Sequence, residues 1–151
     1  MKHPKIRALA TANPQYVMTV SDALHLGQTL FAEHFQNFER FAEAYTNAGI
    51  EKRHICVPLE WLFDNHQWKE RSDLYLEEAV NLAEKAIRNC ISESGLSLDQ
   101  IDGIVAVSST GFATPSLDAH LCERLALRSN TKRLPIMLEW VLPMPKIMNS
   151  L

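Results

Sequence analysis

The chain has 151 residues, of which 46% are hydrophobic and 22% are charged, so it can bury a core and is too apolar to be intrinsically disordered. Its formal net charge is -3 and it contains no basic run, which argues against a nucleic-acid partner. Residues 1–15 are too polar for a signal peptide, and no apolar run approaches the ~20 residues of a membrane span. We therefore expect a cytoplasmic protein with neither a nucleic-acid nor a membrane partner.

The cysteines and histidines indicate neither a disulfide framework nor a metal site. Cys56, Cys90 and Cys122 are odd in number and far apart. The six histidines include no i,i+4 pair and no cluster with cysteine or carboxylate at ligand spacing. We expect no metal, no cofactor, and structural rather than reactive thiols.

The first predicted elements are a strand, a helix and a short strand. Residues 5–12 are small and apolar and end at Asn13-Pro14, which is typical of a strand followed by a turn. Apolar and aromatic residues at spacings of three and four predict a helix from Ser21 to Tyr45. Residues 49–58 alternate imperfectly and predict a short strand.

The clearest predicted element is a helix from Ser72 to Ser94. Ser72 can cap its start, and Gly95 stands where a helix commonly ends in a left-handed residue. Its apolar stripe consists of Leu76, Ala79, Val80, Ala83, Ala86, Ile87, Cys90 and Ile91. The alanines in this stripe let the helix approach a sheet or another helix closely.

A strand rich in apolar residues follows this helix. Residues 104–107 are consecutive and apolar, which predicts a strand buried on both faces, as in the centre of an α/β sheet. It runs into the polar cluster 108–111, at the strand end where open α/β sheets bind ligands. By itself such a cluster is more often a solvated turn with a helix cap.

The last predicted elements are a helix and another buried strand. Thr114 or Ser116 caps the helix, Pro115 suits its first turn, and its buried row is Leu117, Leu121 and Leu125. The strand begins in KRLPIML, at Lys132. The order β, α, β, α, β, α, β predicts a layered α/β domain.

Three strings, IEKRHI, DLYLEEAVNLAEKAI and IDGIVAVSSTGFATPSLDAHLCERLALRSNTKRLPI, resemble the N-terminal half of the type III polyketide synthases. This is the chalcone and stilbene synthase family, and the resemblance to its bacterial members covers residues 5–136. VSSTG-x-ATPSLDA is its most specific part. The resemblance implies the N-terminal half of a thiolase-like (αβαβα) fold and a homodimer. It also implies condensation of a starter acyl-CoA with malonyl-CoA, using a nucleophilic cysteine assisted by a histidine and an asparagine.

The resemblance also implies a substrate pocket and a CoA site. Thr110, next to Gly111, matches a position that lines the family's active-site cavity. Thr114 matches the position that reaches across the dimer into the partner's cavity. Lys52 and Arg53 fall near the family's basic mouth for the CoA phosphates.

Arg40 belongs to the same basic group, whereas Glu43 and Asn47 depart from the family's basic pattern. The alternative interpretation of Lys52 and Arg53 is a solvated strand edge.

The family's nucleophile follows KR and an apolar strand, inside a G-C-x-G-G turn. Here the corresponding stretch MLEWVLPMP contains neither glycine nor cysteine. The resemblance therefore implies a partial synthase domain over residues 1–136 and an aberrant tail over 137–151, from a frameshift or a truncated gene. We expect no catalytic residue in this chain and no turnover by the chain alone. One alternative is a non-catalytic thiolase-like interaction module. The other is a different thiolase-fold condensing enzyme, such as a ketoacyl synthase, but the sequence string ATPS argues against that second alternative.

Overall fold

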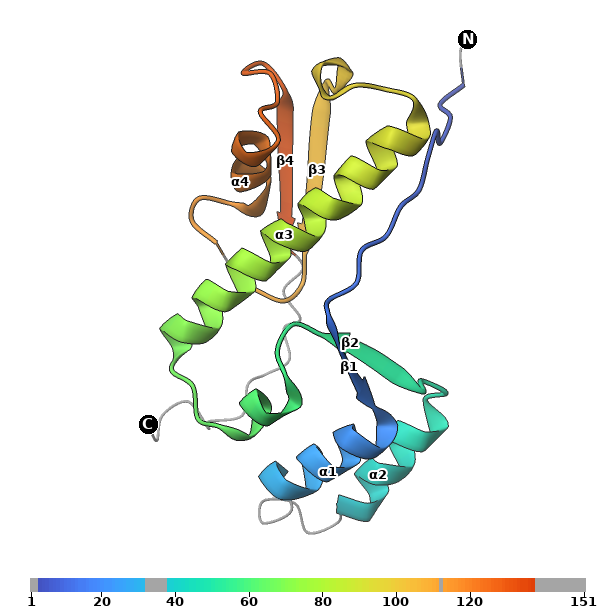
Figure 1. The fold of residues 1–151 in the computed structure, drawn as a ribbon, viewed down its shortest axis with the longest axis vertical. Coiled ribbons are helices and arrows are strands. Elements are labelled where there is room, and N and C mark those ends of the chain that lie inside the picture. The colour runs from blue at the N-terminus through green and yellow to red at the C-terminus, as the bar shows by residue number, and fades with distance from the viewer. Residues whose placement is uncertain (1–2, 32–37, 112, 138–151) are drawn as a thin grey trace. The chain divides into compact units, whose positions relative to one another are not determined.

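A computed structural model describes residues 3–31, 38–111 and 113–137. It divides into two compact units, residues 12–71 and residues 72–151 together with 1–11. The order of elements agrees with the α/β prediction (Figure 1).

The unit of residues 12–71 contains a two-stranded antiparallel sheet and three helical segments. These are β1 (Tyr16–Thr19), α1 (Val20–Phe31), α2 (Phe38–Asn47), β2 (Lys52–Ile55) and the 3-10 helix η1 (Leu59–Phe63). Tyr16 lies opposite Ile55 and Thr19 opposite Lys52. β2 confirms the short strand expected within residues 49–58.

A reciprocal cap fixes the start of α1. The Thr19 hydroxyl and backbone N–H donate to the Asp22 carboxylate at 2.7 and 2.9 Å, and the Asp22 N–H donates back to the Thr19 hydroxyl oxygen at 3.2 Å. These hydrogen bonds, the Thr19 side-chain one above all, lower the pKa of Asp22 below its ordinary value.

Two predictions in this first part of the chain need correction or stay untested. The strand predicted over residues 5–12 is wrong, because residues 3–14 form no strand and the first strand is β1. Ile6 and Leu9 are exposed there, and a segment of small apolar residues forms a strand only where a second strand pairs with it. The helix predicted from Ser21 to Tyr45 is represented by α1 and α2, and residues 32–37 lie outside the described residues.

The second unit combines a long helix with a parallel pair of strands. Its elements are α3 (Trp68–Ser94, whose first residues belong to the other unit), the 3-10 helix η2 (Leu98–Gln100), β3 (Gly103–Ser108), α4 (Leu117–Arg124) and β4 (Lys132–Met137). Gly103 lies opposite Lys132, and Ser108 lies opposite Met137. Figure 1 shows α3 passing obliquely across the two strands.

The prediction that Ser72 caps α3 is wrong, because the helix starts at Trp68. The Arg71 N–H already donates to the Gln67 carbonyl at 3.1 Å, so the backbone hydrogen bonds of the helix begin before Ser72. The other end is as predicted: α3 ends at Ser94, and Gly95 adopts a φ of +70°.

One hydrophobic core joins α3, α4 and β3. Val80, Leu121 and Leu125 are buried at its centre. Partly buried residues pack around them, namely Leu76, Ala83, Ile87, Leu98, Ile104, Leu117 and Leu127. This confirms the apolar stripe of α3 and the leucine row of α4. Ser116 is the N-cap residue, so Pro115 precedes α4 and does not occupy its first turn.

The predictions that β3 is buried on both faces and that β4 is a buried strand are wrong. Along β3 the exposure alternates, and every residue of β4 is exposed. The register pairs Val105 with Leu134 and Val107 with Ile136, and these four exposed side chains form what we call the outer sheet face. Among the described residues, α3 and α4 pack on the opposite face, which carries Ile104.

Candidate functional site

Ser108, the last residue of β3, organises the loop that follows it. Its hydroxyl donates to the Gly111 carbonyl at 3.2 Å and accepts the Thr110 backbone N–H at 3.4 Å. The Tyr75 hydroxyl of α3 lies 2.5 Å from the same oxygen. Because Ser108 has one proton and Gly111 receives it, Tyr75 donates to Ser108. The loop is therefore tied to α3 at the carboxyl end of β3.

Gly111 has no room for a side chain. A Cβ built on it would lie 2.6 Å from Cδ1 and 2.7 Å from Cε1 of Tyr75. The tyrosine ring thus lies directly on the Gly111 backbone, and the absence of a Cβ permits this approach. Gly111 and Ser108 together fix where Tyr75 lies.

A cavity of about 20 Å³ lies beside this loop, enclosed by α3, α4 and the ends of both strands. Its lining includes Tyr75, Ser108, Gly111 and Asp118. That volume suits about one water molecule. The cavity is therefore a small pocket of the second unit that is too small for an acyl chain.

Asp118, in the first turn of α4, is a buried charge beside the cavity. Its side chain is 1% exposed, and neither carboxylate oxygen accepts a hydrogen bond from the described residues. The nearest cationic group is Arg133 of β4, whose Nη1 lies 3.5 Å from Oδ2. The amino-terminal end of α4 also favours a negative charge. The sequence indicated Asp118 only as an early acidic residue of a helix, and no local pattern revealed its burial.

The predicted pocket residues come from this one loop. Gly111 lines the cavity, whereas Thr110 and Thr114 are exposed and do not line it. Thr114 precedes Pro115 through a cis peptide bond. Sequence reasoning missed Tyr75. Ser108 belongs to the polar cluster 108–111 that the sequence predicted at the strand end, although it was not among the predicted pocket residues.

The predicted CoA-binding residues belong to the other unit. Lys52 and Arg53 are exposed on β2, and the side chain of Arg40 in α2 lies outside the described residues. Arg53 lines an open groove of about 410 Å³, together with apolar residues of α1 such as Leu26. Their relation to the loop after β3 stays a prediction.

The three cysteines differ in exposure. Cys56 is exposed, and Cys90 and Cys122 are half-buried. Burial raises the pKa of the Cys122 thiol, and nearby Arg133 opposes that shift only in part. Cys122 therefore stays a neutral thiol near neutral pH, as expected of a structural cysteine.

The described ranges contain neither a cluster of metal ligands nor a membrane-spanning helix. No group of three His, Cys, Asp or Glu side chains there could hold a metal ion. No helix there is long and apolar enough to cross a membrane.

Residues 3–141 match the family model of the chalcone and stilbene synthases, N-terminal domain. The chain is 29% identical over 136 residues to a putative chalcone synthase of Bacillus subtilis, covering 87% of this chain and 37% of that protein. It is 31% identical over 131 residues to 1,3,6,8-tetrahydroxynaphthalene synthase of Streptomyces peucetius, covering 87% of this chain and 35% of that protein.

The fold has a matching relative among solved structures. The 1,3,6,8-tetrahydroxynaphthalene synthase of Streptomyces coelicolor, a bacterial type III polyketide synthase, superposes with a TM-score of 0.77 at 28% identity. The match covers 86% of this chain and 38% of that one. The chain spans little more than a third of the length of the curated relatives it matches. It belongs to the chalcone and stilbene synthase family, matches the N-terminal domain, and has the thiolase-like α/β fold expected from its sequence.

Proposed function

We propose that this member of the chalcone and stilbene synthase family derives from a type III polyketide synthase, an acyltransferase that condenses a starter acyl-CoA with malonyl-CoA. The observation that carries the proposal is the continuous family match over residues 3–141. The relatives named as synthases of polyketide products support it.

In this family a cysteine thiolate accepts the acyl group, and a histidine and an asparagine stabilise the enolate formed when malonyl-CoA loses CO2. We assign none of these three groups to residues 1–136. In this proposal Thr110 and Gly111 contribute to the wall of the active-site cavity of a complete synthase, which is not the cavity of about 20 Å³ beside Gly111, and Thr114 reaches into the second active-site cavity of a homodimer. The hydrogen bonds of Ser108 support the first assignment, because they hold the loop at the carboxyl end of β3.

We assign the CoA phosphates to Lys52 and Arg53, with Arg40 beside them. The exposure of the first two residues on β2 supports this role, since a phosphate can reach them from solvent. Their charge attracts the CoA phosphates at long range without selecting an acyl chain.

In this proposal the 151-residue chain does not turn over by itself, and residues 137–151 form an aberrant tail. Met137 still belongs to β4, and the family match extends to residue 141. The test begins with the coding DNA after the codon for Ile136. If a frameshift created the tail, another frame encodes a G-C-x-G-G turn followed by a histidine and an asparagine in family context. Expression of that frame should give a dimer that decarboxylates malonyl-CoA and extends an acyl-CoA. Replacing the restored cysteine by alanine should abolish extension, because no other nucleophile accepts the acyl group.

The exposed outer sheet face favours a second candidate, a non-catalytic module that pairs with a full-length relative. The same DNA separates the two candidates. If no frame contains the glycine-rich turn, the frameshift proposal fails and the module becomes the better interpretation.

A further inference from the structure

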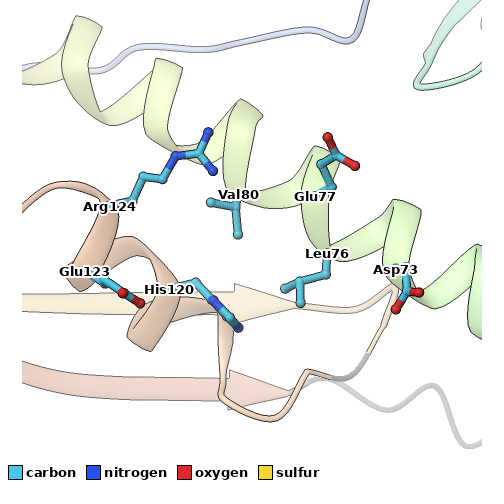
Figure 2. A pocket seen from close by; sticks show the side chains of 7 residues that line it. All are labelled: Asp73, Leu76, Glu77, Val80, His120, Glu123 and Arg124. Carbon is cyan, nitrogen blue, oxygen red and sulfur yellow. The ribbon is translucent and has the colours of Figure 1, made fainter.

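A groove of about 450 Å³ lies between α3 and α4 and shares no lining residue with the cavity beside Gly111 (Figure 2). Its volume is within the range of ligand and peptide sites in proteins. The half-buried Leu76 of α3 forms its apolar floor, and Val80, one helical turn further along, lies beneath that floor with only 4% of its surface exposed.

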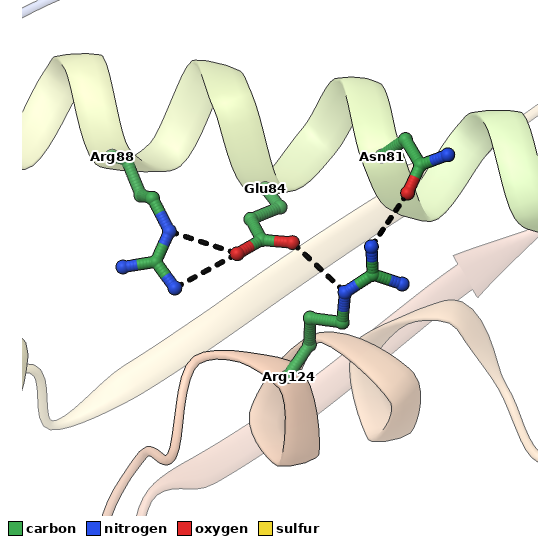
Figure 3. A network of polar contacts seen from close by, with 4 residues as sticks. All are labelled: Asn81, Glu84, Arg88 and Arg124. Atoms are coloured by element: carbon green, nitrogen blue, oxygen red, sulfur yellow. Dashed lines mark hydrogen bonds and ion pairs between the residues drawn. The ribbon is translucent and has the colours of Figure 1, made fainter.

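Among the described residues, Arg124 is the only arginine that lines the groove, and it is already paired along one wall (Figure 3). Arg124 Nε lies 2.9 Å from Glu84 Oε2, and its Nη2 donates to the Asn81 side-chain oxygen at 2.7 Å. Glu84 also pairs with Arg88 at 2.8 Å. This network holds α4 against α3 and leaves little of the Arg124 charge to act in the groove.

Two of the three acidic side chains that line the groove are in the opposite situation. Glu77 and Glu123, one from each helix, are exposed, and neither forms an ion pair within the described residues. The groove therefore combines an apolar floor with a net negative rim, which complements a ligand that is apolar on one side and basic at its edges.

His120 adds an unsatisfied polar atom to the same wall. Its Nε2 is buried and has no hydrogen-bond partner among the described residues. Figure 2 shows the ring directed from α4 to the space beside Leu76. A buried ring nitrogen without a partner is costly, and a polar group of an occupant could relieve that cost.

We propose that this groove docks a basic amphipathic helix of a partner protein. The apolar face of that helix packs on the half-buried Leu76, and lysines beside that face pair with Glu77 and Glu123. This interaction surface is separate from the acyl-transfer chemistry proposed above. It requires neither the loop after β3 nor residues 138–151.

The test uses the full 151-residue chain and a synthetic helical peptide with leucines on one face and lysines beside them. Binding is measured by calorimetry at low and high salt, and we expect weaker binding at high salt. The double reversal Glu77→Lys/Glu123→Lys should weaken binding about tenfold, because two attractive pairs become two repulsive ones. Glu93→Lys is the matched control, since Glu93 is exposed on the same helix and does not line the groove.

A charge swap makes the result specific. A peptide with glutamates in place of its lysines should bind the double-reversal variant and not the wild type, a gain that an unfolded variant cannot produce. If circular dichroism shows that the reversal unfolds the chain, Glu77→Gln/Glu123→Gln replaces it, with weaker binding of the basic peptide as the expected result. Three results would overturn the proposal. The wild type could bind the basic and the acidic peptide equally well, or the Glu93→Lys control could lose as much affinity for the basic peptide as the double reversal does. A simple alkylamine at the same concentration as the peptide could also displace it completely, which would show that only an amine and not a helix is recognised.

Discussion

The outer sheet face should make this chain bind hydrophobic dyes and associate weakly with itself. Its four side chains are Val105, Val107, Leu134 and Ile136, which are 61%, 54%, 55% and 37% exposed. Full burial of such a side chain is worth about 1.5–3 kcal/mol, so covering the roughly half that each still exposes is worth about 3–6 kcal/mol for the four together. Association costs at least about 4 kcal/mol in lost freedom. The face alone therefore supports only weak association.

The perturbation is the triple variant Val105→Thr/Val107→Thr/Leu134→Thr, because threonine keeps the strand preference while removing apolar surface. Sedimentation velocity over a concentration series should show wild-type association that weakens in the variant, and dye fluorescence should fall with it. Ile50→Thr is the control, since Ile50 is exposed in the other unit and does not belong to the face. A compact wild-type monomer with little dye binding, unchanged by the three threonines, would show that the face is covered in solution and would refute the reasoning.

The other predictions concern the loop after β3 and the thiols. Gly111→Ala should lower the free energy of unfolding by about 1–3 kcal/mol, since the new methyl group overlaps the Tyr75 ring. Gly103→Ala should change it by less than about 1 kcal/mol, because its nearest contact would be an ordinary 3.5 Å; equal effects in urea denaturation contradict this assignment. Cys122 should be alkylated more slowly than Cys56 at pH 8, with a rate that rises only at higher pH because burial raises its pKa, and faster labelling of Cys122 would exclude that burial. Mass spectrometry after incubation with acyl-CoA should show no stoichiometric adduct on any cysteine, and a specific adduct would identify an unexpected nucleophile.

The sequence predicted the elements whose patterns are local. The stripe of α3, the leucine row of α4 and the glycine after Ser94 all depend on spacings within a few turns, and the structure contains each of them. The parallel pair of β3 and β4 follows from two apolar runs joined by a helix.

Predictions that depended on distant partners failed. Residues 104–107 are consecutively apolar, but the sequence does not say which segment covers each face, and only one face is covered within the described residues. Residues 5–12 have a strand's composition and no partner strand. At the site, the contact of Tyr75 with Gly111 joins α3 to a loop 36 positions away (75 to 111), and no spacing rule reaches that far.

Among its described residues, the second unit contains a buried polar group without hydrogen-bond donors, Asp118, and an exposed apolar surface, the outer sheet face. Asp118 needs hydrogen-bond donors, whereas the outer face needs apolar cover. They lie on opposite sides of the sheet, because Asp118 meets Arg133, the register partner of Ile104 on the helix-covered side. A single segment packed on the outer face could cover Val105 and Leu134 without reaching Asp118. Cover on the outer face therefore cannot stabilise the buried Asp118 carboxylate. The structure supplies two favourable charges near it, the amino-terminal end of α4 and Arg133.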